Sequence, residues 1–315
     1  MNRPLLSIVV PLYRSADCIE RLISELSALP VEGGCELVLV NDGSPDNTAE
    51  LAEKFMQTSG RAITLVKLAR NFGEHNAVMA GLHHARGEFI VTMDDDLQNP
   101  PSEVLKLLHH ARSGGYEVVY SYYAEKQHEA WRNIGSWLTN RVADVLLDKP
   151  RGLYLCTFRI LSAFVAREVC HYDGPFAYVD GLILQVTQNI GRIQVEHVPR
   201  ASGQSGYTLS KLLHLWLSMF VNFSVVPLRI ATFAGFAIAA LSFVYFLSVL
   251  IERWQGIPPQ GWSSLMAALL AFCGTQLILL GIAGEYIGRI FLTANKRPQF
   301  VVRDVVRNAG GESAL

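Results

Sequence analysis

The chain has 315 residues, with 27 lysines and arginines against 28 aspartates and glutamates and a formal net charge of −1. This balance gives no reason to expect a nucleic-acid partner, which would call for a basic surface. The average hides a division, because residues up to about Pro199 mix charged and apolar side chains, whereas Ile230–Ile251 and Ile257–Gly284 contain no Asp, Glu, Lys or Arg. Each of these two runs is long enough to cross a bilayer, which takes about 20 apolar residues.

The five cysteines form no CxxC pair and no zinc-like pattern with histidine, so we expect reduced, packed thiols in a cytosolic setting. At the N-terminus the apolar run Leu5–Val10 stops at Pro11, which is too short for a signal peptide. The chain is therefore expected to start in the cytosol and to enter the membrane through its C-terminal third.

Predicted strands and helical stretches alternate along the first hundred residues. This alternation favours an α/β fold with a parallel sheet and crossover helices, in which ligands bind beyond the carboxyl ends of the strands. Ser15 and Ser44 stand where they can cap the first two helices. The predicted strands are Leu5–Val10, Glu36–Val40, Ile63–Leu68 and Phe89–Met93, and the polar turns expected to converge on one crevice are Tyr13-Arg14, Asn41-Asp42 and Asp94-Asp95-Asp96.

Three adjacent carboxylates, Asp94, Asp95 and Asp96, follow the fourth predicted strand directly. Carboxylates this close repel one another unless a cation lies between them, and Mg²⁺ and Mn²⁺ prefer oxygen ligands. The alternative is a solvated, acidic helix N-terminus, where aspartate is favoured by capping and by the helix dipole. Three acids in a row after a buried strand favour a metal or substrate site.

Further along, Leu105–Arg112 is predicted as a helix and Glu117–Tyr120 as a strand. Lys126–Asp144 is predicted as a helix with a basic, aromatic face, which is either a solvated amphipathic surface or a site for phosphates or lipid headgroups. Tyr207–Phe223 is apolar except for a narrow polar stripe, which suits a helix at the membrane interface; a buried core helix is the alternative.

Two membrane spans are predicted at about Leu228–Ile251 and Trp262–Ile287, joined by a short outer loop, Glu252–Gly261. More positive charge flanks the terminal sides of the spans than lies in the loop, which predicts that both termini are cytosolic. The flanking charges are Arg229, Arg289, Lys296 and Arg297.

Gly281, Gly284 and Gly288 form a small-residue face on the second span, which indicates close helix packing or oligomerisation. Glu285 is either interfacial or paired with an arginine of a neighbouring helix. Gln299–Val305 is predicted to return as a strand. The predicted parts are an α/β domain (1–205), an interfacial helix (206–227), a two-span hairpin (228–288) and a cytosolic tail (289–315).

A crevice that contains acids, with arginines downstream, suits a nucleotide diphosphate whose charge a metal and the arginines neutralise. The sequence has no GxxxxGK[ST] loop, no GxGxxG fingerprint and no GxSxG elbow, which argues against P-loop hydrolysis, dinucleotide binding and acyl hydrolysis. The function that these motifs leave open is the transfer of a group from an activated donor.

Five short motifs occur in order: Val9-Val10-Pro11-Leu12-Tyr13, Val40-Asn41-Asp42-Gly43-Ser44, Arg70-Asn71-Phe72-Gly73, Met93-Asp94-Asp95-Asp96-Leu97-Gln98 and Gly284-Glu285-Tyr286-Ile287-Gly288-Arg289. Together they resemble inverting family 2 glycosyltransferases of the polyprenyl-phosphate type. This group includes dolichyl-phosphate mannose synthases and bacterial enzymes that load glucose or 4-deoxy-4-formamido-arabinose onto undecaprenyl phosphate. The resemblance covers nearly the whole chain and implies a GT-A (Rossmann-like) domain followed by interfacial helices and two C-terminal transmembrane helices.

The resemblance also implies roles for single residues. On the donor side, Asp42 recognises the base or ribose, Asp94 contacts the nucleotide sugar, Asp96 holds Mg²⁺ or Mn²⁺, and Gln98 faces the transferred sugar or the acceptor. Pro11, Tyr13 and Arg70 complete the donor pocket. The implied acceptor residues are Arg132 and Ser136, which hold the lipid phosphate, Arg159 and Arg200, which lie near the active site, and Ser205 and Tyr207, which belong to a closing loop.

Three positions depart from the family pattern. Arg14-Ser15 replaces the usual Asn-Glu, which puts an acidic donor contact in doubt, and Tyr123 stands where relatives often have arginine, so that phosphate binding is expected to use Lys126 instead. Asp95 replaces the usual small residue inside the Asp-x-Asp and is expected to be a spare acid that points away.

The implied reaction is an inverting transfer in which a phosphate oxygen of the lipid attacks the anomeric carbon. A lipid monophosphate has a second pKa of about 6, so no strong general base is required. The resemblance further implies a multi-pass protein of the bacterial inner membrane with a cytosolic catalytic domain, a UDP-sugar in preference to a GDP-sugar, and a homo-oligomer such as a tetramer. Its product would serve cell-envelope or lipopolysaccharide modification.

Two other functions are weighed. A processive polysaccharide synthase is disfavoured, because such enzymes need several channel helices and a Gln-x-x-Arg-Trp motif that this chain lacks. A non-catalytic scaffold or sugar-nucleotide sensor is favoured slightly by Arg14-Ser15, and the retained acids together with Arg132 and Ser136 argue against it.

Overall fold

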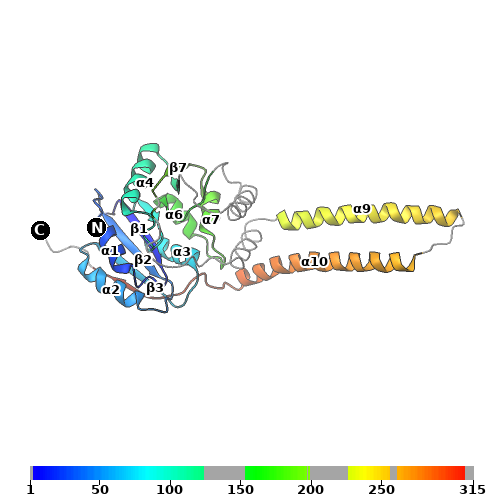
Figure 1. Ribbon diagram of the computed structural model, residues 1–315, viewed down its shortest axis with the longest axis horizontal. Helices are drawn as coiled ribbons and strands as arrows, with labels where there is room; N and C mark the ends of the chain where they lie inside the picture. Colours follow the sequence, from blue (N-terminus) through cyan, green and yellow to red (C-terminus); the bar gives the residue numbers. More distant parts are fainter. Residues whose placement is uncertain (1–2, 124–152, 197, 199–225, 256–260, 309–315) are drawn as a thin grey trace. The chain divides into compact units, whose positions relative to one another are not determined.

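The computed structural model describes residues 3–123, 153–196, 198, 226–255 and 261–308. It divides into two compact units, one formed by Met1–Gly206 with Lys296–Leu315 and the other by Tyr207–Asn295. The predicted helices Lys126–Asp144 and Tyr207–Phe223 lie outside the described residues. The first unit carries the sheet and the second carries two long helices (Figure 1).

Parallel strands form the centre of the first unit. They lie in the order β3 (Ala62–Leu68), β2 (Cys35–Asn41), β1 (Leu6–Leu12) and β4 (Phe89–Thr92). All seven residues of β2 are buried, as expected for a parallel strand with both faces covered. The predicted parallel α/β sheet is confirmed, with each strand within two residues of its expected bounds.

The sheet is extended on both sides of this centre. Beyond β4 lie β6 (Arg159–Ser162), which is antiparallel to its neighbours, then β5 (Val118–Tyr122) and β7 (Ile190–Gln194). On the other edge, β8 (Val302–Arg307) pairs antiparallel with β3, so the strand expected near Gln299–Val305 is confirmed. The full order is β7-β5-β6-β4-β1-β2-β3-β8.

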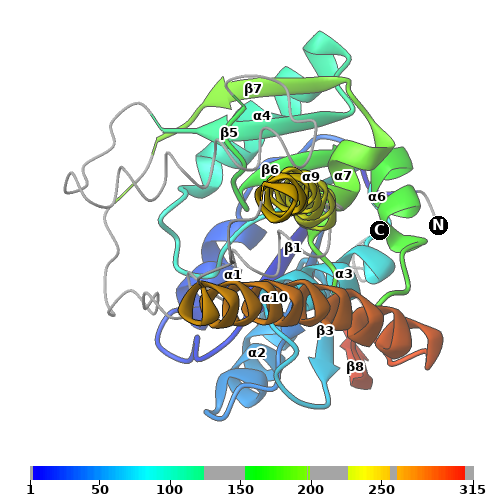
Figure 2. The ribbon, with the colours of Figure 1, turned by 90° about the vertical axis from the view of Figure 1, so that its right-hand side faces the viewer.

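Helices cover both faces of the sheet (Figure 2). On one face, the even-numbered residues of β1 pack with α1 (Ile19–Ser27), α2 (Thr48–Thr58) and α4 (Pro101–Gly114) in one apolar cluster. On the opposite face, Val9 meets α3 (Glu74–His84), where a Cβ on Gly81 would lie 2.3 Å from Val9 Cγ1. This alternation is the two-residue period of a strand. α6 (Ala163–Cys170) and α7 (Val179–Val186) pack with α3.

The first two helices start later than predicted. α1 begins at Ile19 and α2 at Thr48, and neither has a side-chain cap. Ser15 donates its hydroxyl to Asp95, and Ser44 donates its hydroxyl to Asp46 at 2.5 Å. The predicted caps were wrong because a cap must accept an amide of the first helical turn, and neither hydroxyl does; the Thr48 amide donates to Asp46 Oδ1 at 3.3 Å instead.

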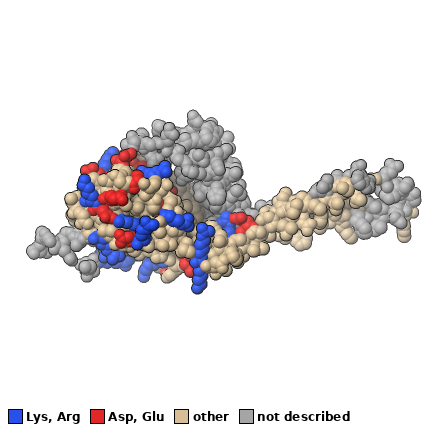
Figure 3. Space-filling model, turned by 90° about the horizontal axis from the view of Figure 1, so that it is seen from below, with Lys and Arg blue, Asp and Glu red and all other residues tan. Residues whose placement is uncertain are grey.

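The second unit consists of α9 (Val226–Trp254) and α10 (Trp262–Ala294), which include both predicted spans. Among the described residues, Ala271–Ala294 has the length and the mean hydropathy, 1.6, of a membrane span, and Ala231–Tyr245 is a shorter apolar segment. On the face seen in Figure 3, the described part of this unit carries few charged side chains. Glu285 pairs with Arg289 on the same helix, at 2.9 Å, so the interhelical partner considered for it is not what the structure shows.

Gly43 follows β2 and has a φ of +59°, and a Cβ at this position would lie 2.3 Å from the backbone of Arg70. Gly60 has a similar φ of +63° with open space around it. We expect Gly43→Ala to cost about 1–3 kcal/mol more than Gly60→Ala, because overlap with backbone adds to the strain that both share. Thermal unfolding of the two full-length variants measures this difference, and equal losses would show that the loop yields.

Candidate active site

Loops from the carboxyl ends of β1, β2, β3 and β4 meet at one edge of the sheet. The Asp42 amide donates to Leu12 O at 3.0 Å, and the Met93 amide donates to Val9 O at 3.2 Å, which carries the strand pairing into the loops. The side chains of Asp42 and Asp95 then bridge to neighbouring loops. The convergence of the polar turns on one edge is therefore what the structure shows.

Asp42 holds the loop between β3 and α3. Its Oδ1 accepts from the Phe72 amide at 2.7 Å and its Oδ2 from the Gly73 amide at 2.9 Å. Burial raises the pKa of Asp42 above its usual range, and the two amide donors oppose that rise. Both carboxylate oxygens thus already have backbone partners, and the predicted contact of Asp42 with a base or ribose stays a prediction.

Asp94 and Asp96 lie in the loop after β4. Asp94 Oδ2 accepts from Thr157 Oγ1 at 3.1 Å. Burial and, to a smaller extent, the negative charges of Glu74 and Asp96 raise the pKa of Asp94 to about 7. Asp96 Oδ1 accepts from the Gln98 amide at 3.1 Å, across Leu97, whose φ is +54°. A left-handed leucine is rare, and this one lies in the turn that joins Asp96 to Gln98.

The side chain of Asp95 is hydrogen-bonded to the loop after β1. It accepts from the Ser15 hydroxyl and from the Tyr13 amide. Burial raises the pKa of Asp95, and these two hydrogen bonds lower it. The Ser15 amide donates in turn to Thr48 Oγ1 at 3.0 Å, at the start of α2. Asp95 is therefore not the spare acid that was expected, because it fixes the loops that follow β1 and β2.

Polar groups on both sides support the acidic loop. Gln98 accepts through its backbone carbonyl from the Val198 amide at 2.9 Å. Tyr123, where related enzymes often have arginine, donates its hydroxyl to Asn99 Oδ1 at 2.9 Å. Tyr123 thus anchors the acidic loop, and Lys126, the expected substitute for the arginine, lies outside the described residues.

Two arginines stack on aromatic rings beside these loops. The Arg14 guanidinium lies 5.5 Å from the centroid of Tyr13, which is 44% exposed, and the Arg70 guanidinium lies 4.5 Å from the centroid of Phe72. Arg14 has a φ of +59° and donates its amide to Ser44 Oγ at 2.7 Å. The sequence presented Arg14-Ser15 only as the loss of an acidic contact, whereas the structure shows the Arg14 guanidinium beside the Tyr13 ring.

Arg159 belongs to a buried charge cluster. Its side chain is fully buried, and its Nη1 donates to Asp180 Oδ1, which also accepts from Tyr120 Oη at 2.9 Å. Asp180 raises the pKa of Arg159 against the opposing effect of burial, so this arginine stays charged. Among the described residues, its Nε and Nη2 have no hydrogen-bond partner. The predicted acceptor role of Arg159 stays a prediction, since the partner that the structure gives it is internal.

Asp180 and Tyr120 were not predicted as members of the site. One signal was available, because Asp180 is the one acid in the mostly apolar helix α7 and a buried carboxylate requires a partner. Its partner lies on β6, whose place beside β4 the sequence did not reveal. Thr157, two residues before Arg159, bonds Asp94 and so connects this cluster to the acidic loop.

The predicted acceptor residues Arg132, Ser136, Arg200, Ser205 and Tyr207 lie outside the described residues. Pro11, the remaining predicted donor residue, is half-buried within β1. The residues predicted for the donor therefore lie in the loops at one edge of the sheet, whereas most roles predicted for the acceptor stay predictions.

The donor set suits a divalent cation that also binds ligand oxygens. In the described part of the chain, no group of three or more His, Cys, Asp and Glu side chains is arranged to hold a metal alone. Mg²⁺ typically takes one or two carboxylates and completes its shell with water and substrate phosphates, which fits Asp94 and Asp96. The raised pKa of Asp94 is the behaviour expected of crowded, buried carboxylates that lack a counter-ion.

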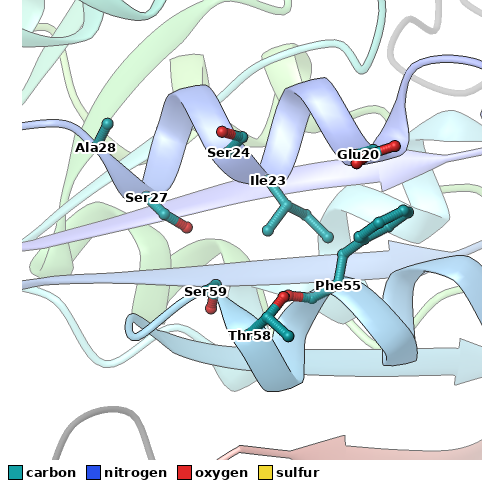
Figure 4. Close-up of a pocket in the computed structure, with 8 residues that line it drawn as sticks. All are labelled: Glu20, Ile23, Ser24, Ser27, Ala28, Phe55, Thr58 and Ser59. Carbon is teal, nitrogen blue, oxygen red and sulfur yellow. The ribbon is translucent and has the colours of Figure 1, made fainter.

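A pocket elsewhere in the domain lies between α1 and α2 (Figure 4). Its lining is mainly small and hydroxyl-bearing, and it includes none of the predicted site residues. The lining residues are Glu20, Ile23, Ser24, Ser27, Ala28, Phe55, Thr58 and Ser59. Since these helices cover one face of the sheet, the pocket is separate from the strand-end loops.

Comparison with known proteins identifies two families along the chain. Residues 7–170 match the family model for glycosyl transferase family 2, and residues 226–290 match the model described as the GtrB C-terminal hairpin. The first match covers the parallel strands and the acidic loop, and the second covers most of α9 and α10.

Whole-length relatives are undecaprenyl-phosphate 4-deoxy-4-formamido-L-arabinose transferases. The protein from Pseudomonas aeruginosa (strain LESB58) is 33% identical over 96% of this chain and 91% of its own length. The one from Edwardsiella ictaluri (strain 93-146) is 32% identical over 96% of this chain and 94% of its own. Among solved structures, glucosyl-3-phosphoglycerate synthase from Mycobacterium tuberculosis is similar over 68% of this chain and 76% of that one, with 20% identity and a TM-score of 0.48.

The buried pair Arg159–Asp180 is open to a double-mutant test. We expect Asp180→Asn and Arg159→Met each to destabilise the protein by about 3–5 kcal/mol, because each leaves an uncompensated buried polar or charged group. The double variant should lose clearly less than the sum, since no lone charge remains and the amide oxygen introduced by Asp180→Asn can still accept from Tyr120. Unfolding of the full-length variants measures the coupling, and strictly additive losses would contradict it.

Proposed function

Because the chain belongs to glycosyl transferase family 2, it is a glycosyltransferase, and we propose that it transfers a sugar from a nucleotide-diphosphate donor to polyprenyl phosphate. The acceptor is inferred from relatives that are named for undecaprenyl phosphate and align over 96% of the chain, hairpin included. The observation that carries the proposal is the acidic loop after β4, where Asp94 and Asp96 stand among the ends of four parallel strands.

The donor is proposed to be a UDP-sugar bound at the strand ends. Tyr13 offers an exposed ring for the base, with Pro11 beside it at the end of β1, and Arg70 is an exposed cation suited to a diphosphate. Asp42 supports the pocket by holding the loop that follows Arg70, and reaches the base or ribose from there. Arg14, whose guanidinium lies beside the Tyr13 ring, adds positive charge next to Ser15, which stands where the family pattern has an acid.

Mg²⁺ or Mn²⁺ is proposed to bind through Asp96, with Asp94 beside it. When bound, such a cation would neutralise charge on the leaving diphosphate. Asp94 orients the nucleotide sugar, while Thr157 fixes the carboxylate of Asp94 through its hydroxyl. Gln98, which follows Asp96 in the same turn, is assigned to the sugar or the acceptor.

On the acceptor side, Arg132, Ser136, Arg200, Ser205 and Tyr207 are proposed to hold and enclose the lipid phosphate. Arg159 is proposed to act from inside the domain. It is connected to the acidic loop by Thr157, two residues earlier, which donates to Asp94. A phosphate monoester with a second pKa of about 6 is largely ionised at neutral pH, so its oxygen needs no strong base to attack the anomeric carbon. Positioning and electrostatic stabilisation then supply most of the rate, and the configuration inverts.

The reaction is proposed to take place at the cytosolic face of a bacterial inner membrane. The apolar segment Ala271–Ala294 supports membrane attachment through α10, and α9 is assigned to a second span. Both termini are then cytosolic, and the protein is a homo-oligomer such as a tetramer. The lipid-linked monosaccharide would supply cell-envelope glycan or lipopolysaccharide modification.

Substitutions of Asp95 and Asp96 should affect activity and stability differently. Asp96→Ala should lower kcat by about 10²–10³-fold, because it removes the carboxylate assigned to the metal. Asp95→Ala should keep much more of the activity and instead lower Tm, because it frees Ser15 and the loop after β1. Transfer of labelled sugar to lipid and thermal unfolding measure the two effects. Equal inactivity of both variants would show that the roles within the triplet are wrongly divided.

The product itself tests the proposed reaction. Detergent-solubilised protein incubated with UDP-sugars, undecaprenyl phosphate and Mg²⁺ or Mn²⁺ should form a lipid-linked monosaccharide, seen by mass spectrometry. A polymer would indicate a processive synthase, and the absence of product with every donor, GDP-sugars included, would favour a sugar-nucleotide-binding scaffold. EDTA serves as the control, and it should stop the reaction because the leaving diphosphate loses its counter-ion.

A further inference from the structure

The chain that follows α10 returns to the sheet and runs along β3. β8 pairs with β3 from Thr64, opposite Arg307, to Leu68, opposite Val302. This segment lies beyond both family matches, which end at residues 170 and 290. It belongs to the same compact unit as the sheet although it follows α10 in the sequence.

An irregularity interrupts this pairing beside the active-site loops. Lys67 pairs with Asp304 and Leu68 pairs with Val302, so Arg303 is left over as the extra residue of a bulge. Bulges re-aim side chains and are common next to active sites. Here the Arg303 Nη2 donates to the carbonyl of Ala69 at 3.2 Å.

Ala69 is held through both of its backbone groups. Its amide donates to Val301 O at 2.9 Å, and its carbonyl accepts from Arg303. Ala69 is also the residue directly before Arg70, where the loop that Asp42 holds begins. The backbone of Arg70 is pressed against Gly43 on its other side. The loop is thus clamped between β2 and the returning strand.

Both ends of the returning segment are anchored independently of Arg303. At the far end, the Asn308 side chain accepts from the Ile63 amide at 2.7 Å and donates to Arg61 O at 2.9 Å. At the near end, buried Gln299 donates to Gly174 O at 3.3 Å, and Phe300 packs edge-on against His83 at 5.6 Å. Loss of the Arg303 side chain should therefore leave the strand in place.

We propose that Arg303 is a positioning residue for the donor pocket, which sets the Arg70–Gly73 loop through the carbonyl of Ala69. The proposal rests on the proposed function in one respect, namely that this loop contacts the nucleotide diphosphate. Arg303 itself touches no donor atom. Its effect is on donor affinity, because a loop that is less well held must be ordered when the donor binds.

The test is nucleotide binding by full-length variants in detergent, with UDP and Mn²⁺ as the probe and GDP in parallel. Arg303→Ala should raise the Kd for UDP about threefold to tenfold, the range expected for one hydrogen bond, and Arg303→Lys should recover part of it. Arg307→Ala is the matched control, since it removes an equal charge from the exposed far end of the same strand. The donor KM should rise with the Kd, while the KM for undecaprenyl phosphate and the apparent Tm stay at the parental values.

An unchanged Kd in Arg303→Ala would overturn the proposal, and so would an equal rise in Arg307→Ala. A fall in Tm that accounts for the weaker binding would also overturn it, because Arg303 would then serve the strand and not the loop. If the parent bound neither UDP nor GDP, the donor site of the proposed function would itself be wrong. The parental titration therefore separates the two failures.

Discussion

Repulsion among three carboxylates at the end of β4 is the constraint around which the active-site edge is arranged. Each acid accepts a hydrogen bond from a different donor. The donors are the Thr157 hydroxyl for Asp94, the Ser15 hydroxyl for Asp95 and the Gln98 amide for Asp96. These donors are neutral, so they orient the carboxylates without cancelling their charge. Burial is the main reason that the pKa of Asp94 is raised to about 7, and the negative charges of Glu74 and Asp96 add to the rise. A divalent cation that arrives with a diphosphate would remove this cost, which links donor binding to metal binding.

The same hydrogen bonds connect the acids to the rest of the domain. Asp95 ties the acidic loop to the loop after β1 through Ser15, whose amide reaches Thr48 on α2. Asp42 ties the end of β2 to the loop after β3. On the far side of that loop, the strand that follows α10 closes the edge of the sheet. The pocket is therefore built from loops that hold one another, and few of them can move alone.

Much of the fold could be predicted from the sequence because the parallel strands are continuous apolar runs and their polar turns mark the ends. A returning strand was also predicted near Gln299–Val305, where β8 lies. What could not be predicted was pairing between distant residues. Nothing local indicated that β6 would insert antiparallel beside β4, and so the partnership of Arg159 with Asp180 remained hidden.

The same limit applies to the site. Asp94 and Asp96 could be singled out because adjacent acids after a buried strand are chemically conspicuous. Ser15 was misread as a helix cap and Asp95 as a spare acid, because each residue's partner is the other, 80 positions away. Local propensity favours serine at a helix start, but α1 begins only at Ile19, and the Ser15 hydroxyl donates to Asp95.

The different roles assigned to Asp95 and Asp96 are tested most directly by measuring the affinity for Mn²⁺ in the presence of UDP. Calorimetric titration of Asp95→Asn and Asp96→Asn compares two variants that each remove one negative charge. Asp96→Asn should weaken Mn²⁺ binding by at least about tenfold, whereas Asp95→Asn should stay within about threefold of the parent. Equal weakening in both variants would contradict the assignment of Asp96 to the metal and of Asp95 to the loop after β1.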